Sequence, residues 1–304
     1  MNRRPLPLIC LLALALLLPA VAAEPPYGPP EQLFKLQDPR INEASGLAAS
    51  AKSDDLLFTH NDSGDGANLY AFDMQGRTLA MLRVKGAFAL DWEDIARGPD
   101  ESGNPSLFLA DIGDNFRIRP HLTVYRIPEP AIHPSQPGRA GETAPAAAFD
   151  LRYPDGARDA EGLFVHPRTG QLFVVTKSAQ GSAIFAAPVP LKPKVANTMT
   201  KLASIQFDQF GETEGSKRDP SGSRLATGAD ISPDGERIVI RTYTDAWEWR
   251  VKGDDVAAAF RIRPKQVPLP ALRGGEAIAY SRSGDALFVT VEGGSPPVHR
   301  LQRR

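Results

Sequence analysis

Five short acidic or small-polar clusters recur along the chain, and each runs directly into an apolar stretch. Two carboxylates about 4 Å apart repel by about 4 kcal/mol at an effective dielectric of about 20. Such clusters are tolerated when a cation binds between them, when they share protons, or when they accept backbone N–H hydrogen bonds. The candidate metal ligands in these clusters are Glu43, Asp91, Glu93, Asp159, Glu161, Asp230 and Glu276.

The type of donor indicates which metal would bind. Carboxylates are hard oxygen ligands, and the only cysteine, Cys10, lies in the N-terminal apolar run. The five histidines are scattered without metal-binding spacing. These features favour calcium over zinc or copper. Two alternatives stay open: a structural collar of carboxylates bonded to backbone N–H groups, and a catalytic role.

A second group of polar residues lies at the ends of the strands that follow the acidic clusters. The group mixes acids with one lysine and one arginine, which would suit an anionic ligand held by the two cations, although polar strand ends at a surface are also common. The candidate ligand-binding residues are Asn61, Asp62, Asp111, Lys177, Arg241 and Glu292.

Two familiar site patterns fit poorly. The segment 61–66 has the alternating oxygen donors and glycine of a calcium loop, but Phe72 stands where an EF-hand needs its bidentate glutamate. The sequence also has no Gly-x-Ser-x-Gly motif, so it gives no support to a serine hydrolase of that kind.

The elements around these residues repeat with the acidic clusters. After each cluster comes a turn and then an apolar strand, at 56–59, 107–109, 172–175, 238–240 and 287–290. A repeat of roughly 50 to 70 residues made of short strands is typical of a β-propeller. The sequence therefore predicts an all-β fold, a single propeller of five blades with four antiparallel strands each.

The outer strands and the ring closure complete this prediction. We expect fourth strands at 148–151, 205–207 and 260–262, and we expect residues 32–36 to close the ring by completing the last blade. A six-bladed ring would need a hidden repeat in the longer second or third copy. The extra residues there, 129–147 and 211–222, have the composition of loops.

The N-terminus has the pattern of an export signal. Two arginines precede an apolar run and a small-residue cleavage site, which predicts a signal peptide at 1–23, a Pro-rich leader at 24–31 and the propeller at 32–304. We expect a periplasmic or secreted monomer. The formal net charge of −1, without a basic block, gives no sign of nucleic-acid binding, and no further apolar run predicts a membrane span.

The repeated motifs resemble those of a known family. Glu43-Ala-Ser-Gly-Leu47, Asp159-Ala-Glu-Gly-Leu163 and Gly274-Gly-Glu-Ala-Ile278 look like the SdiA-regulated family of exported bacterial propellers. The resemblance implies five blades and covers the chain from about residue 33 to its end. The motifs are also similar to those of phytase-like and NHL-type propellers. The chain differs from the pattern in its more acidic second copy, Asp91-Trp-Glu-Asp94, and in the loop 111–115.

Together these observations predict an exported binding protein with a calcium-holding acidic mouth at the centre of the ring. Its ligand would be an anionic small molecule, an envelope component or a protein partner. The alternative is a calcium-dependent hydrolase of phytase-like phosphoesters or of lactones, in which the cation would polarise the substrate or activate water.

Overall fold

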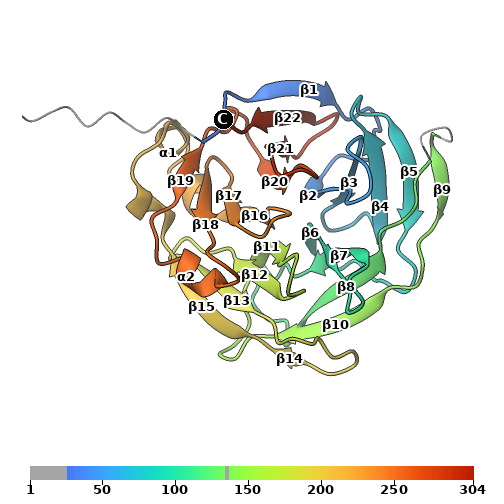
Figure 1. Cartoon of the computed structure of the whole chain (residues 1–304), viewed down its shortest axis with the longest axis horizontal. Coiled ribbons are helices and arrows are strands. Elements are labelled where there is room, and N and C mark those ends of the chain that lie inside the picture. The colour runs from blue at the N-terminus through green and yellow to red at the C-terminus, as the bar shows by residue number, and fades with distance from the viewer. Residues whose placement is uncertain (1–25, 134–136) are drawn as a thin grey trace, which may run out of the picture.

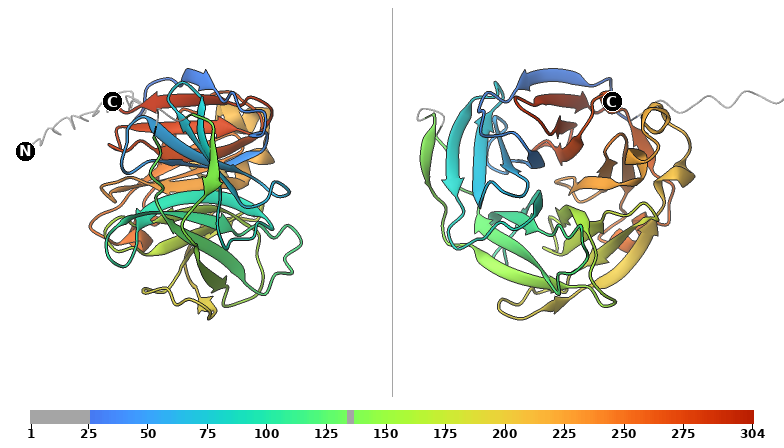
Figure 2. Two further views of the ribbon diagram at one scale, coloured as in Figure 1. Left: turned by 90° about the vertical axis from the view of Figure 1, so that its right-hand side faces the viewer. Right: turned by 180° about the vertical axis from the view of Figure 1, so that it is seen from behind.

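Five small sheets stand around a central axis in the computed structural model, which describes residues 26–133 and 137–304 (Figure 1). The predicted signal peptide lies outside the described residues. The architecture confirms the predicted all-β propeller with five blades. Figure 2 shows the same ring from its side and from behind. Among the described residues, no helix has the length and apolar character needed to cross a membrane.

Each blade is built on four antiparallel strands, and the innermost of them is the first of that blade after the preceding blade. Blade 1 contains β2 (Ala44–Ala49), β3 (Leu56–Asn61), β4 (Asn68–Asp73) and β5 (Thr78–Arg83). Blade 2 contains β6 (Trp92–Pro99), β7 (Pro105–Asp111), β8 (Leu122–Pro128) and β10 (Ala147–Arg152). Blade 3 contains β11 (Ala160–Val165), β12 (Leu172–Thr176), β13 (Ser182–Ala186) and β15 (Thr200–Ile205). Blade 4 contains β16 (Ala226–Ile231), β17 (Arg237–Thr242), β18 (Ala246–Arg250) and β19 (Lys265–Val267). Blade 5 contains β20 (Gly275–Tyr280), β21 (Ala286–Val291) and β22 (Pro297–Gln302), and β1 (Glu31–Lys35) completes it.

The two ends of the described chain close the ring, as predicted. Strand β1 pairs antiparallel with β22, the last strand of the chain. Tyr27, ahead of β1, is fully buried, and its hydroxyl donates a 2.5 Å hydrogen bond to Glu248 in blade 4. Because β1 pairs with β22, the outer edge of β22 is not left unpaired.

Two short strands extend blades beyond four. Strand β9 (Arg139–Glu142) runs parallel to β5 on the outer edge of blade 1, although it belongs to the connection between β8 and β10. Strand β14 (Asn197–Thr198) likewise pairs in parallel with β10. The extra length in the second copy is therefore partly a strand that covers an edge, rather than a loop throughout or a sixth blade.

Four short helices lie in the connections: η1 (Phe207–Phe210), α1 (Glu214–Arg218), η2 (Gly222–Arg224) and α2 (Val256–Ala259). The predicted strand at 260–262 is wrong, because α2 ends at Ala259, these residues form the turn after it, and the fourth strand of blade 4 follows as β19. Asp255 accepts a hydrogen bond from the N–H of Ala258 and so begins α2, and the alanines that follow favour a helix. The fourth strand of blade 3 also ends earlier than predicted, at Ile205.

The core fills the spaces between adjacent blades. One cluster, for example, joins Phe108 and Ala110 of blade 2 to Leu163 and Val165 of blade 3. At the centre the strands approach so closely that only small residues fit. A Cβ atom on Gly46 would lie 2.6 Å from the backbone nitrogen of Ile95 in the next blade.

Candidate functional site

The register of the five inner strands shows which residues are equivalent. In every blade the last residue of the second strand pairs with the first residue of the inner strand, and the ladder then shifts at a bulge. The residue directly after this first pair lies in the bulge. We call the five equivalent residues the bulge ring: Ser45, Glu93, Glu161, Thr227 and Glu276.

The bulge ring contains two hydroxyl residues and three glutamates. The hydroxyls of Ser45 and Thr227 donate to the backbone carbonyls of Glu93 and Gly275 in the following blades, at 2.7 and 2.8 Å. Burial, followed by the charge of Glu161, raises the pKa of both Glu93 and Glu276. The three buried glutamates therefore lie close enough to interact, at the same end of the inner strands.

Two further rings lie at the same end of the sheets. The lead ring consists of the residues directly before the inner strands: Glu43, Asp91, Asp159, Leu225 and Gly274. The rim ring consists of the residues directly after the second strands: Asp62, Ile112, Lys177, Tyr243 and Glu292. Backbone hydrogen bonds of 2.9–3.0 Å join the two rings in blades 1, 3 and 5. We call the three rings together the mouth.

The mouth gathers most of the residues that the sequence singled out. Asp159 accepts the N–H of Asp114 at 2.9 Å and so links blades 2 and 3. Glu43 and Glu292 lie at the exposed margin. Partial desolvation at this margin, followed by the charges of Asp62 and Glu43, raises the pKa of Glu292.

A candidate cation site lies between blades 1 and 2. One carboxylate oxygen from each of Asp62, Asp91 and Glu93 lies within 4.8 Å of the others. Calcium binds oxygen at about 2.3–2.6 Å, so two ligands on opposite sides of one ion are about 5 Å apart. The three carboxylates therefore fit a calcium ion in both spacing and chemistry.

Gly113 leaves room for this cluster. A Cβ atom at this position would lie 2.2 Å from Oε1 of Glu93 and 2.4 Å from Oδ2 of Asp91. Any other residue here would push the two carboxylates apart. The glycine therefore permits the close approach, and the sequence alone did not indicate it.

The electrostatics of the cluster also fit a cation. Burial raises the pKa of Asp62 and, with the charges of Asp62 and Asp159, raises that of Asp91 to about 6. Burial and the charge of Glu161 raise the pKa of Glu93 well above its ordinary value. A bound divalent cation would oppose each of these shifts, because it favours the ionised carboxylates.

Lys177 is the cation of the rim ring. Its ammonium group donates to the carboxylate of Glu161 and, at 2.8 Å, to the hydroxyl of Tyr243. Burial raises the pKa of Glu161 to about 8, and Lys177 holds it below what burial alone would give. Burial lowers the pKa of Lys177 but the Glu161 carboxylate outweighs it, so the lysine stays charged.

Arg241, a predicted ligand-binding residue, is engaged with the backbone of the next blade. It lies one residue before the end of β17 and is buried. Its guanidinium donates to the backbone carbonyls of Ala277 and Thr290 at 2.8 and 3.0 Å, which ties blade 4 to blade 5. Burial lowers its pKa to about 10, and burial raises that of neighbouring Glu276 to about 9.

Asp230 also lies elsewhere than the sequence overlay placed it. The sequence grouped Asp230 with the glutamates of the other clusters, but the bulge register puts Thr227 in line with them. Asp230 lies deeper in β16 and accepts the N–H groups of Ile231 and Tyr280 at 2.8 and 2.7 Å. It therefore joins blades 4 and 5.

Asn61 and Asp111 hold loops at the mouth rather than lining it. The side-chain oxygen of Asn61 accepts the N–H groups of Asn42 and Glu43, both at 3.2 Å. Asp111 accepts the N–H of Asp91 at 3.2 Å and forms a 2.8 Å ion pair with Arg119. Both residues thus position lead-ring carboxylates.

The sequence also missed Tyr243 and the role of Asp94. Tyr243 directly follows the second strand of blade 4, the position that Asp62 and Lys177 hold in their blades, so an overlay of strand ends would have found it. Asp94 lies just below the bulge ring and accepts backbone N–H groups from Ile95, Leu163 and Ala229. One carboxylate therefore joins three consecutive blades.

A cavity of about 770 Å³ adjoins the mouth between blades 4 and 5. Tyr243 and Gly274, of the rim and lead rings, line it together with the exposed Arg218 and Arg273. These two guanidinium groups add positive charge beside Lys177 at the edge of a mainly acidic mouth, and Asp219 lines the same cavity.

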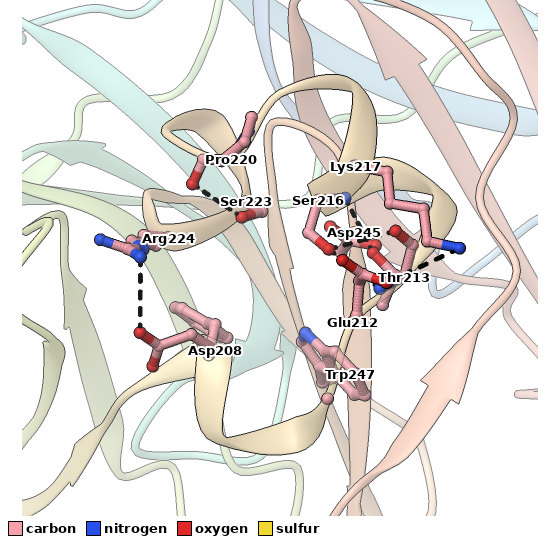
Figure 3. Close-up of a pocket in the computed structure, with 12 residues that line it drawn as sticks. Asp208, Glu212, Thr213, Ser216, Lys217, Pro220, Ser223, Arg224, Asp245 and Trp247 are labelled. Carbon is pink, nitrogen blue, oxygen red and sulfur yellow. Dashed lines mark hydrogen bonds and ion pairs between the residues drawn. The ribbon is translucent and has the colours of Figure 1, made fainter.

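A second cavity of about 430 Å³ lies away from the mouth rings, against β18 (Figure 3). Its rim charges form pairs, Arg224 with Asp208 and Lys217 with Glu212, both at 3.7 Å. Trp247 lines it, and its ring packs against Phe210 with centroids 5.1 Å apart. The paired charges and packed rings fit a structural contact between the helices and blade 4.

Comparisons with known proteins identify no family for this chain. No family model matches the chain, and no curated protein matches it in sequence. Among solved structures, a chain of "Crystal structure of Nidogen/Laminin Complex" is similar, with 13% identity and a TM-score of 0.43 over 83% of this chain and 73% of that chain. The five-bladed architecture follows from the strand pairing of the chain itself.

Proposed function

We propose that this chain is an exported binding protein that holds calcium in the mouth of its propeller and recognises an anionic small molecule there. The observation that carries the proposal is the cluster of Asp62, Asp91 and Glu93, whose oxygens lie within 4.8 Å. The cluster is built on two blades of a rigid ring, so its geometry does not depend on a mobile segment.

The three carboxylates would leave coordination positions open on a calcium ion, which takes six to eight oxygen ligands. An anionic group of the ligand would complete the coordination. The positive charges nearby, Lys177 in the rim ring and Arg218 and Arg273 at the adjoining cavity, would attract the rest of an anionic molecule. Recognition of an envelope component or a protein partner would use the same mouth.

Export and family membership are further parts of the proposal. The repeated motifs that begin at Glu43, Asp159 and Gly274 support membership in the SdiA-regulated type of propeller. The residues 1–23 support export to the periplasm or beyond. Detection of a mature N-terminus near residue 24 in exported protein would test this part.

One observation favours the alternative of a calcium-dependent hydrolase. Glu161 has a pKa raised to about 8 beside a permanently charged lysine, so it can hold or release a proton at neutral pH. In a phosphoesterase or lactonase it would serve as general acid or base near the cation. Calcium-dependent turnover of phosphoesters or lactones that Glu161→Gln abolishes would support this alternative.

Isothermal titration of the mature protein with calcium tests the main proposal. We expect binding by the wild type and at least roughly tenfold weaker binding by Asp91→Asn and Glu93→Gln, because each loses a charged ligand. Asp55→Asn is the matched control, since Asp55 is exposed in the turn between β2 and β3, at the opposite end of its blade. Equal binding by all four proteins, or none by the wild type at millimolar calcium, would contradict the proposal.

A further inference from the structure

Four large apolar side chains project into solvent beside the mouth. Phe88, Leu90, Phe116 and Ile118 are 70%, 53%, 85% and 76% exposed. They account for four of the seven large exposed apolar residues in the described parts of the chain. Their concentration on two connections of one blade indicates an interaction surface, because scattered single residues would need no explanation. We call the four residues the apolar tip.

The strand register places the apolar tip on the same face as the mouth. Trp92, the first residue of β6, pairs with Asp111, the last of β7, which in turn pairs with Thr123 near the start of β8. The loop before β6 and the loop after β7 therefore leave blade 2 at the same end. The first loop carries Phe88 and Leu90, and it continues directly into the candidate calcium ligand Asp91.

Hydrogen bonds hold the two loops in place. Phe88 accepts the indole N–H of Trp92 through its carbonyl at 3.1 Å, and the N–H of Leu90 donates to Asp111 at 3.2 Å. In the second loop, buried Asp114 accepts the N–H groups of Ile118 and Arg119 at 3.0 and 2.9 Å. The apolar side chains are therefore presented on an ordered backbone, which reduces the entropy lost on binding.

Basic charge lies within the apolar tip, although the mouth beside it is acidic. Arg117 lies between Phe116 and Ile118, is exposed, and has a left-handed backbone with φ of 55°. The neighbouring carboxylates would repel anions, but a cation among Asp62, Asp91 and Glu93 would offset that repulsion. Apolar side chains beside basic residues, or beside carboxylates that hold a bound cation, favour binding to the interface of an anionic bilayer.

We propose that the apolar tip inserts into the interfacial region of an anionic lipid bilayer, with Arg117 at the headgroups. The enhancement by calcium rests on the function proposed above, whereas the insertion of the tip does not. A bilayer suits these side chains better than a protein partner does. Protein hot spots are usually packed into complementary pockets, but lipid accepts separate projecting side chains without a matching shape.

Flotation of the mature protein with vesicles tests the proposal. Vesicles of phosphatidylcholine mixed with phosphatidylglycerol are compared with vesicles of phosphatidylcholine alone, in calcium and in EDTA. We expect binding to the anionic vesicles, and roughly tenfold weaker binding by the double variant Phe116→Ser/Ile118→Ser. Arg117→Gln should lose affinity for anionic vesicles and leave the weak binding to neutral vesicles unchanged.

The variant Val189→Ser is the control. Val189 is about as exposed as Leu90, at 56%. It follows the end of β13, which pairs with the start of β12 and so lies at the end of blade 3 opposite the mouth. This variant should bind vesicles like the wild type.

The outcomes separate this inference from the proposed function. Wild-type protein that fails to float in both calcium and EDTA, or a tip variant that floats equally well, overturns the bilayer proposal and leaves a protein partner as the occupant. Calcium binding in solution without vesicles reports on the proposed function alone. Tip-dependent flotation that calcium does not enhance would uphold the insertion and count against the cation site.

Discussion

Removal of the Asp94 carboxylate should strongly destabilise the ring. Asp94 is completely buried and accepts N–H groups from Ile95 at 2.8 Å, Leu163 at 2.8 Å and Ala229 at 3.2 Å. These donors belong to blades 2, 3 and 4 at equivalent positions of the inner strands. Asp94→Ala leaves all three without their acceptor.

The magnitude follows from the number of donors. A buried donor without a partner costs about 1–3 kcal/mol, so three donors would cost about 3–9 kcal/mol. Burial raises the pKa of Asp94 well above its ordinary value, which shows that burying the carboxylate is itself unfavourable, and the alanine variant recovers part of this cost. Water entering from the mouth would satisfy some donors. We therefore expect a loss near the low end, about 3 kcal/mol, against a total stability of about 5–15 kcal/mol for typical domains.

Urea denaturation followed by tryptophan fluorescence would measure this loss. Asp94→Asn keeps one acceptor oxygen and should lose only about 1 to 2 kcal/mol. Asp55→Ala, in an exposed turn, should stay within about 0.5 kcal/mol of the wild type. A loss below about 1 kcal/mol in Asp94→Ala would refute the view that this carboxylate joins three blades.

Three further predictions follow from the mouth and the ring closure. Gly113→Ala should weaken calcium binding by roughly tenfold in a calorimetric titration, because its Cβ would separate two of the ligands, whereas Gly294→Ala, with open space around it, should bind calcium like the wild type. Burial raises the pKa of Glu276 from 4.5 to about 9, so the folded protein binds this proton more tightly than the unfolded chain does. The resulting contribution to folding stability is fully present below about pH 4.5 and is lost as pH rises through about 9. The melting temperature of Glu276→Gln should therefore fall less than that of the wild type from about pH 5 to about pH 9, and parallel profiles would contradict this assignment. Tyr27→Phe removes a buried hydrogen bond to the Glu248 carboxylate and should cost about 1.5–3 kcal/mol in urea denaturation, while an unchanged midpoint would show that this contact does not help to close the ring.

The repeat predicted the fold because each blade forms mainly from strands that lie close together in the sequence. Turn residues separate short apolar strands, and the terminal segment 32–36 has no other partner, so blade number and ring closure followed. Strand β9 could not be predicted in this way. It pairs with blade 1 across more than fifty residues of chain, and its four residues, Arg139–Glu142, are exposed and lack an apolar pattern.

The sequence predicted which types of residue form the site, but not which residues of the five blades are equivalent. Asp230 was grouped with the glutamates because it also runs into an apolar stretch, whereas the bulge aligns Thr227 with the glutamates. This alignment depends on how the second strand pairs, which the motif does not encode. Arg241 lies two positions before the rim residue Tyr243, and its guanidinium donates to backbone carbonyls of blade 5, a long-range contact that the sequence of the strand does not encode.

A crystal structure of the mature protein grown with calcium would show directly whether the mouth binds the cation. We expect one calcium ion bound by Asp62, Asp91 and Glu93, with oxygens about 2.3–2.6 Å from the ion. Electron density that shows these three carboxylates in place without an ion among them, at saturating calcium, would contradict it. The mouth would then be a structural collar that joins the blades.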